Sequence, residues 1–210
     1  MDYINKFDEM ILDLKSSTKI KLIEADFYCM DEILPEVFSK YNYLKPVENE
    51  IKALNDNKIY WEYSDRPGNL IPFGETHLIS IEEVVSSGVQ LWNDYNSKEE
   101  RRLLSELLPF DDHPNGGDGM MGCLRFTNEN HEVWFYNENG EHFKMKLDLS
   151  GYLLKLIELK AIYGWQYLFI DADWKKLQFN IVKSELKKRL QVLNEIFPDI
   201  SMDGYLKKIQ

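Results

Sequence analysis

The sequence predicts an α+β fold in a single domain, with helices towards both ends of the chain and strands between them. Three observations support this prediction. Apolar residues recur at helical spacing near the N-terminus and again after residue 174. Aromatic and β-branched residues concentrate from Lys58 onward, which is typical of strands. An Asn-Gly pair at 139–140 separates two strand-like runs and therefore predicts an antiparallel hairpin.

Composition and charge limit the possible functions. The chain has 210 residues, 44% of them hydrophobic, which is enough for a core without disulfide or metal support. Lys and Arg number 25 against 36 Asp and Glu, so the net charge is −11. The first 170 residues carry −13 and residues 171–210 carry +2. This balance disfavours nucleic acids and anionic membrane surfaces as partners and favours a basic protein.

The first third of the chain predicts two helices. The first is amphipathic and is interrupted at 16–18; its apolar stripe comprises Ile4, Phe7, Ile11 and Leu14. The second is predicted from the apolar residues Ile33 to Tyr41. Pro35 would lie in its first turn, where the missing N–H costs nothing.

The middle of the chain predicts short strands and two capped helices. Ser80 with Glu83, and Ser97 with Glu100, have the spacing of capping boxes, so a helix should follow each serine. The first of these helices is predicted to bury Val84, Val85, Val89 and Trp92. The strand candidates are 59–63, 70–73 and 77–79.

A hairpin at 133–147 is the clearest local pattern. A two-residue type I′ turn at Asn139-Gly140 would place Tyr136 opposite Phe143. In that register one face of the hairpin carries Trp134, Tyr136, Phe143, Met145 and Leu147.

Two helices are predicted in the C-terminal part. The first begins at Ser150 and ends near Gly164, and a short apolar segment, 165–170, follows it. The second runs from about Trp174 until Pro198 stops it. Its apolar positions include Leu177, Ile181, Leu190, Leu193 and Phe197.

Cysteine usage and the N-terminus predict a cytoplasmic protein. Cys29 and Cys123 lie far apart and outside any CxxC spacing, so we expect two reduced thiols. The N-terminal residues lack the basic and apolar regions of a signal peptide. No apolar run approaches the roughly 20 residues of a membrane span.

Residues 111–119, DDHPNGGDG, are acidic and rich in glycine. An EF-hand loop beginning at Asp111 would place Gly122 where calcium binding needs a bidentate Glu. Residues 117–122 match GxGxxG, but a strand-like run follows instead of the helix that receives a pyrophosphate. A solvated surface loop is the simpler interpretation. A divalent-metal hydrolase is the alternative, with ligands from Asp111, Asp112, His113 and Asp118.

The order of the elements resembles that of a known superfamily. Ile33-Leu34-Pro35 opens a helix, Leu108-Pro109-Phe110 precedes a Gly-Gly-Asp loop at 116–118, and the hairpin follows. This succession is similar to the SUKH superfamily, which includes fungal cell-wall-assembly regulators and bacterial immunity proteins. The resemblance covers residues 31–170. It leaves 1–30 as an N-terminal helical extension and 171–210 as a mildly basic C-terminal helix packed on the core.

The resemblance implies a mostly antiparallel sheet flanked by helices, no enzymatic activity and no cofactor. It also implies an immunity protein that binds and neutralises a cognate toxin, and the net charge favours a basic toxin such as a nuclease. A regulatory scaffold that binds signalling proteins and the metal-dependent hydrolase remain as alternatives. The residues expected to contact the partner, all placed on predicted loops, are Asp65, Glu75, Asp111, Asp112 and Asp118.

Overall fold

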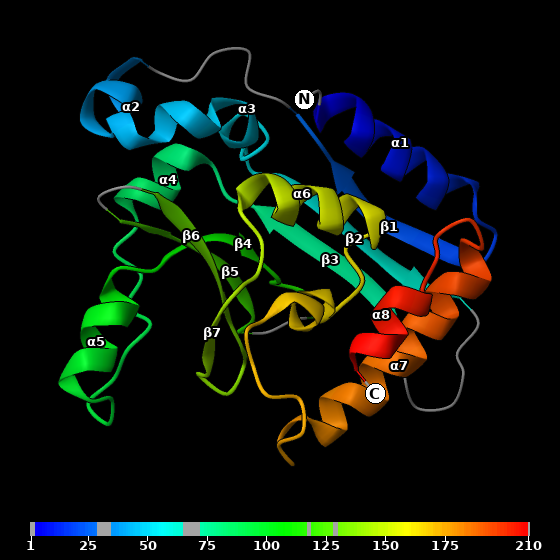
Figure 1. The fold of residues 1–210 in the computed structure, drawn as a ribbon. Helices are drawn as coiled ribbons and strands as arrows, with labels where there is room; N and C mark the ends of the chain where they lie inside the picture. Colours follow the sequence, from blue (N-terminus) through cyan, green and yellow to red (C-terminus); the bar gives the residue numbers. More distant parts are fainter. Residues whose placement is uncertain (1–2, 29–34, 65–71, 117–118, 128–129, 210) are drawn as a thin grey trace.

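The computed structural model describes residues 3–28, 35–64, 72–116, 119–127 and 130–209. Its strands form one antiparallel sheet in which each strand pairs with the next strand in sequence (Figure 1). The predicted α+β class and the antiparallel sheet are therefore confirmed. In sheet order the strands are β1 (Ile20–Asp26), β2 (Asn57–Tyr63), β3 (Phe73–Leu78), β4 (Leu108–Asp112), β5 (Met121–Phe126), β6 (His131–Tyr136) and β7 (His142–Lys144).

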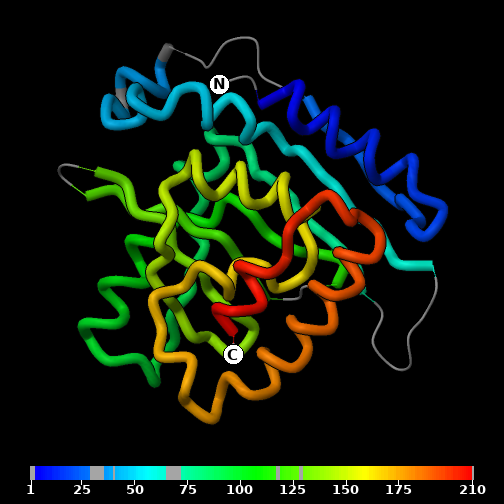
Figure 2. The backbone as a smooth tube through the Cα atoms, turned by 45° about the vertical axis from the view of Figure 1, so that its right-hand side comes forward, coloured from blue at the N-terminus to red at the C-terminus, as the bar shows by residue number. Residues whose placement is uncertain are grey.

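Helices pack on both faces of the sheet, most of them on one face. The main core joins α1, α6 and α7 to that face, as the two views of the chain show (Figures 1 and 2). Among the described residues, no helix is both long and apolar enough to cross a membrane. The helices are α1 (Tyr3–Ser16), α2 (Pro35–Lys40), η1 (Asn42–Val47), α3 (Glu48–Ile51), α4 (Ile81–Ser86), α5 (Lys98–Ser105), α6 (Leu149–Glu158), η2 (Trp165–Phe169), α7 (Phe179–Ile196) and α8 (Asp203–Lys208).

The alternation of side chains along β5 and β6 separates two hydrophobic clusters. Leu124 and its partner Val133 point into the main core. Cys123 and its partner Trp134 point to the opposite face, where they meet Leu104 of α5 in a smaller cluster. Helix α5 covers this second face only at β5 and β6. At β1–β3 neither hydrophobic cluster lies on this second face, and the site described below is found there.

The N-terminal half confirms the predicted helices and adds a strand. Helix α1 buries Phe7, Ile11 and Leu14 as expected, but Ile4 is exposed and Tyr3 and Met10 complete the buried stripe. Helix α2 begins at Pro35; Ile33 and Leu34 lie outside the described residues. Strand β1 was not predicted, because a bulge between Leu22 and Glu24 disturbs its alternation.

The central region differs from the prediction in two elements. A single strand, β3, replaces the two short candidates, and Leu70 and Ile71 lie outside the described residues. Ser80 caps α4 as predicted, but the helix ends at Ser86, so Val89 is exposed. The capping box of Ser97 and Glu100 is present in full.

The hairpin is confirmed, but its predicted register is wrong by one residue. Tyr136 pairs with His142, and Phe135 pairs with Phe143. The loop contains three residues, since Asn137 N–H donates to the carbonyl of Glu141 and Gly140 has a φ of 77°. A three-residue loop ending in a left-handed glycine is the usual alternative to the type I′ turn. Phe143 consequently lies on the core side with Phe135, while Trp134 and Tyr136 lie on the opposite side.

The C-terminal helices also differ in detail. Asp148, and not Ser150, caps α6, because its Oδ1 accepts the N–H of Gly151 at 2.7 Å. Helix α6 ends at Glu158, and Gly164 instead precedes η2. Helix α7 ends before Pro198 as predicted, and its residues Leu190 and Leu193 lie in the core. The predicted apolar positions Leu177 and Ile181 are instead exposed.

Candidate functional site

The face of β1–β3 opposite the main core carries a set of polar side chains, which is interrupted on β3 by Phe73 and by the buried Glu75. Paired residues in antiparallel strands point to the same side of a sheet. The pairs Lys21–Glu62, Glu24–Tyr60, Asp26–Lys58, Lys58–His77 and His77–Asp112 therefore share one side. We call these residues the open sheet face; it comprises Lys21, Glu24, Asp26, Lys58, Tyr60, Glu62, His77 and Asp112, together with Asp56, which contacts His77.

The open sheet face is acidic. Its acids outnumber its two lysines and comprise Glu24, Asp26, Asp56, Glu62 and Asp112. The Tyr60 hydroxyl donates to Oε1 of Glu62 at 2.8 Å. Burial and this carboxylate raise the pKa of Tyr60 to about 12, so the phenol stays neutral at physiological pH. A surface of this kind offers carboxylates beside an aromatic ring, which suits the lysines and arginines of a basic partner.

His77 connects two carboxylates of this face. Its Nε2 lies 2.5 Å from Oδ1 of Asp56, and its Nδ1 lies 2.7 Å from Oδ1 of Asp112. The hydrogen bond to Asp112, joined by that to Asp56, raises the pKa of His77. The bond to His77 in turn lowers the pKa of Asp56. The three side chains form a chain of opposite charges when the imidazole is protonated.

Glu75 was expected on a loop, and this expectation is wrong. It lies in β3 and is 1% exposed. Its two carboxylate oxygens accept the backbone N–H groups of Asn115, at 2.5 Å, and of Gly116, at 2.8 Å. The segment after β4 thus folds over Glu75, whose carboxylate holds that segment against the sheet.

Asp111 was also expected on a loop, and the structure places it inside the protein. It is fully buried in β4. Its Oδ1 accepts the hydroxyl of Thr76 at 2.7 Å and the N–H of His77 at 3.1 Å, and its Oδ2 accepts the hydroxyl of Tyr152 at 2.6 Å. Burial raises the pKa of the Asp111 carboxyl. Asp111 therefore joins β3, β4 and α6 and presents nothing to a partner.

His113 continues this buried network. Its Nδ1 lies 3.0 Å from the carbonyl of Met120, and its Nε2 accepts from the amide of Gln166 at 3.2 Å. The same amide is 3.3 Å from the Tyr152 hydroxyl. His113 and Asp111, two of the metal ligands in the metal-hydrolase alternative, thus form hydrogen bonds to other protein groups. Within the described ranges, no three His, Cys, Asp or Glu side chains are grouped to hold a metal ion.

Of the five residues predicted to contact a partner, Asp112 lies on the open sheet face. It belongs to β4 and not to a loop. Its side chain is 34% exposed and points away from Asp111, because successive residues of a strand face opposite sides. Asp65 and Asp118 lie outside the described residues.

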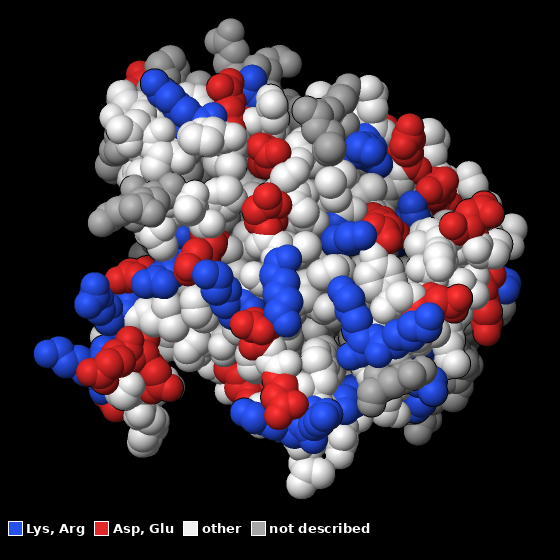
Figure 3. All heavy atoms as spheres, in the orientation of Figure 1, with Lys and Arg blue, Asp and Glu red and all other residues white. Residues whose placement is uncertain are grey.

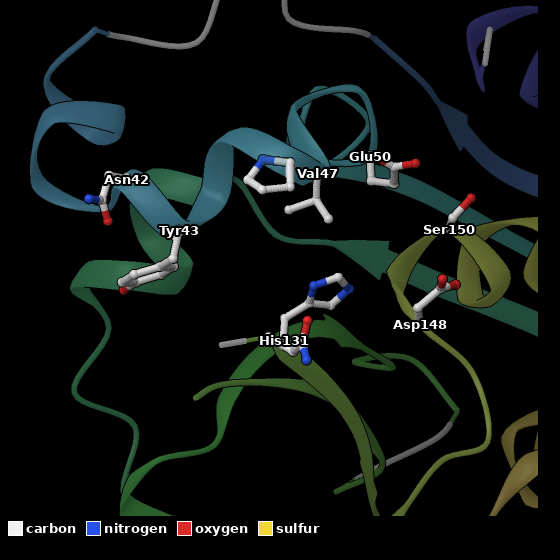
Figure 4. A pocket seen from close by; sticks show the side chains of 9 residues that line it. Asn42, Tyr43, Val47, Glu50, His131, Asp148 and Ser150 are labelled. Carbon is white, nitrogen blue, oxygen red and sulfur yellow. The ribbon is translucent and has the colours of Figure 1, made fainter. Parts of the chain in front are cut away.

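A pocket of about 550 Å³ lies on the other side of the sheet, between η1 and the beginnings of β6 and α6. Figure 4 shows Glu50, Asp148 and Ser150 at the α6 side of this pocket, Tyr43 at the opposite side and His131 between them. The full lining comprises Asn42, Tyr43, Pro46, Val47, Glu50, Asn130, His131, Asp148 and Ser150.

The surface over α6, α7 and α8 has a mixed charge. Figure 3 shows Lys and Arg interleaved with Asp and Glu across this side of the molecule. Several of these charges are paired, as Lys146 is with Asp171 at 3.0 Å and Lys155 with Glu158 at 2.5 Å. This helix-covered side of the molecule therefore does not show the excess of carboxylates found on the open sheet face.

Comparison with known proteins identifies no family for this chain. No family model, no curated protein and no solved structure matches the chain.

Most residues of the two sites were missed by the sequence interpretation. The alternation in 57–63 could have placed Lys58, Tyr60 and Glu62 on one face, because Ile59 and Trp61 between them are core residues. No such signal exists for the pocket, whose lining comes from three segments far apart in sequence.

Proposed function

We propose that this chain is a protein-binding domain of the SUKH type and acts as an immunity protein that neutralises a basic toxin. The observation that carries the proposal is the open sheet face, where carboxylates outnumber lysines beside an exposed edge of the sheet. Complementary charge accelerates encounter with a basic partner and suppresses wrong partners, which suits a protein that must capture a toxin before it acts. The resemblance in element order supports the immunity role.

The test compares partner capture by two variants with the same change in charge. The first, Glu24→Lys with Asp26→Lys, reverses two acids of β1 on the open sheet face. The second, Asp8→Lys with Glu9→Lys, reverses two exposed acids of α1, which packs on the opposite face. Each variant serves as bait in its native lysate at low and moderate salt, and bound proteins are identified by mass spectrometry.

We expect the wild type and the α1 variant to capture a basic protein whose binding weakens as salt rises, and the β1 variant to lose it. Expression of the captured protein should be toxic, and co-expression of the wild type should restore growth. Equal capture by both variants would contradict the assignment to the open sheet face.

The regulatory scaffold is the second candidate function. The same acidic face supports it, since a basic signalling protein would use the same charge complementarity. A captured signalling or cell-envelope protein that is not toxic would replace the immunity role with the scaffold role.

A further inference from the structure

The pocket has an end built from hydrogen-bond acceptors. The Tyr3 hydroxyl donates to Oε1 of Glu50 at 3.0 Å and lies 2.7 Å from Oγ of Ser150. A hydroxyl has one proton, so Ser150 must be the donor to Tyr3. Burial, together with the charge of Glu50, raises the pKa of Tyr3 to about 12, and the phenol remains a donor. Ser150 is thereby left with lone pairs for the pocket.

Both carboxylates of the pocket keep one oxygen available. Oδ1 of Asp148 caps α6 through the N–H of Gly151, and Oε1 of Glu50 accepts from Tyr3. Within the described part of the chain, the second oxygen of each carboxylate receives no hydrogen bond. A carboxylate prefers several donors, so this end of the pocket favours a group that brings both donors and positive charge.

The wall of the pocket supplies no positive charge of its own. None of the described lining residues is Lys or Arg. His131 accepts the backbone N–H of Leu149 at its Nε2, at 3.3 Å. Two carboxylates in a described lining without Lys or Arg make an acidic site, and its volume is in the range of small-molecule pockets.

The rest of the pocket is mixed, because Asn42, Asn130 and His131 line it together with apolar residues. Pro46 and Val47 of η1 form part of the wall, and Figure 4 places the Tyr43 ring at the end opposite Ser150. An aliphatic chain can lie against these residues while its charged head reaches the carboxylates. A guanidinium is the cation best suited to that head position, because its planar fork donates several hydrogen bonds at once and is weakly hydrated.

We propose that this pocket binds a guanidinium group carried on an aliphatic chain. The group belongs either to a free arginine-like amine or to an arginine side chain of another protein. The pocket lies on the opposite side of the sheet from the open sheet face, so this inference is independent of the proposed function.

Titrations monitored by NMR and calorimetry test the proposal with three probes. Agmatine represents a free guanidinium, and the blocked peptide acetyl-Gly-Arg-Gly-amide represents a protein side chain. Acetyl-Gly-citrulline-Gly-amide has nearly the same shape without the charge. We expect agmatine, the arginine peptide or both to bind, with amide shifts in η1 and at the beginning of α6, and citrulline to bind at least about tenfold more weakly.

Two variants assign the binding to the carboxylates. Glu50→Gln with Asp148→Asn removes both charges but keeps an acceptor for Tyr3 and a good N-cap for α6. We expect this variant to stay folded and to bind at least about tenfold more weakly. Glu48→Gln is the control, since Glu48 pairs with Lys52 at 3.1 Å and does not line the pocket.

The outcomes distinguish a free guanidinium compound from a protein side chain, and they show when the proposal is wrong. Binding of the arginine peptide as tight as that of agmatine indicates a protein side chain, and binding of agmatine alone indicates a small molecule. The proposal is overturned if neither probe saturates the pocket, if the citrulline peptide binds as well as the arginine peptide, or if the double variant binds like the wild type.

Discussion

At the scale of single residues, His77 gives the open sheet face a dependence on pH. Asp112 and Asp56 stabilise its imidazolium in the folded protein and raise its pKa above the ordinary value of 6.5. The folded state then binds this proton more tightly than the unfolded state does. The resulting contribution to stability is complete below pH 6.5 and is lost as the pH rises through the raised pKa.

Replacement of His77 by glutamine tests this dependence. Gln keeps a donor for one carboxylate but does not titrate. We expect the free energy of unfolding of the wild type to exceed that of His77→Gln at pH 6, and the difference to shrink by pH 9. Urea unfolding at each pH measures the difference, and NMR titration of the His77 ring gives its pKa. A difference that does not vary with pH would show that the ion pairs contribute nothing.

Asp111 and Asp112 show what a sequence cannot reveal at this scale. The two aspartates are adjacent in sequence and precede a glycine-rich segment. Their residue type alone therefore predicts that both lie on the surface. The structure buries Asp111 because Thr76 and Tyr152 supply its hydrogen bonds, and these partners lie 35 and 41 residues away. Only the pairing of β3 with β4 and the packing of α6 bring such partners together.

At the scale of elements, local signals predicted the positions of helices and strands better than their registers. The 133–147 hairpin illustrates the difference. Asn139-Gly140 located the turn correctly, but Asn137 decided its type, because its buried side chain accepts the N–H groups of Asn139 and Glu141. That contact favours a three-residue loop, and the extra loop residue moves Phe143 from the side of Tyr136 to the side of Phe135.

Alanine at Gly140 tests this turn. Gly140 has a φ of 77°, which a residue with a Cβ adopts at a cost, so Gly140→Ala should lower the free energy of unfolding by about 1 kcal/mol. Gly88 is the control: it is exposed, and a Cβ there meets no atom within 4 Å. Gly88→Ala should change stability by less than about 0.5 kcal/mol in the same urea titration. Equal effects at the two positions would contradict the assigned turn.

At the scale of the whole molecule, the terminal helices belong to the same core as the sheet. Phe7 of α1, Leu153 of α6 and Leu190 of α7 are fully buried in one cluster. Sequence patterns indicated amphipathic helices at both ends but not what their apolar faces meet. The pocket was beyond prediction for the same reason, since it exists only where η1, β6 and α6 are packed together.

Shared packing predicts cooperative unfolding. Leu190→Ala should lower the free energy of unfolding by about 2–5 kcal/mol and leave a single transition by tryptophan fluorescence and circular dichroism. Ile181→Ala, on the same helix but 73% exposed, should cost less than about 0.5 kcal/mol. If α7 were a separate unit, Leu190→Ala would split the transition in two and leave the later one unchanged.

The bulge in β1 has a consequence for the behaviour of the protein at high concentration. β1 is the first strand in the sheet order, and an edge strand can recruit the strand of another molecule and begin aggregation. The irregularity between Leu22 and Glu24 breaks the spacing that such a strand would need, and the neighbouring charges of Lys21 and Asp26 oppose a close apolar approach. The bulge that obscures β1 in the sequence thus disfavours pairing of β1 with a strand of another molecule.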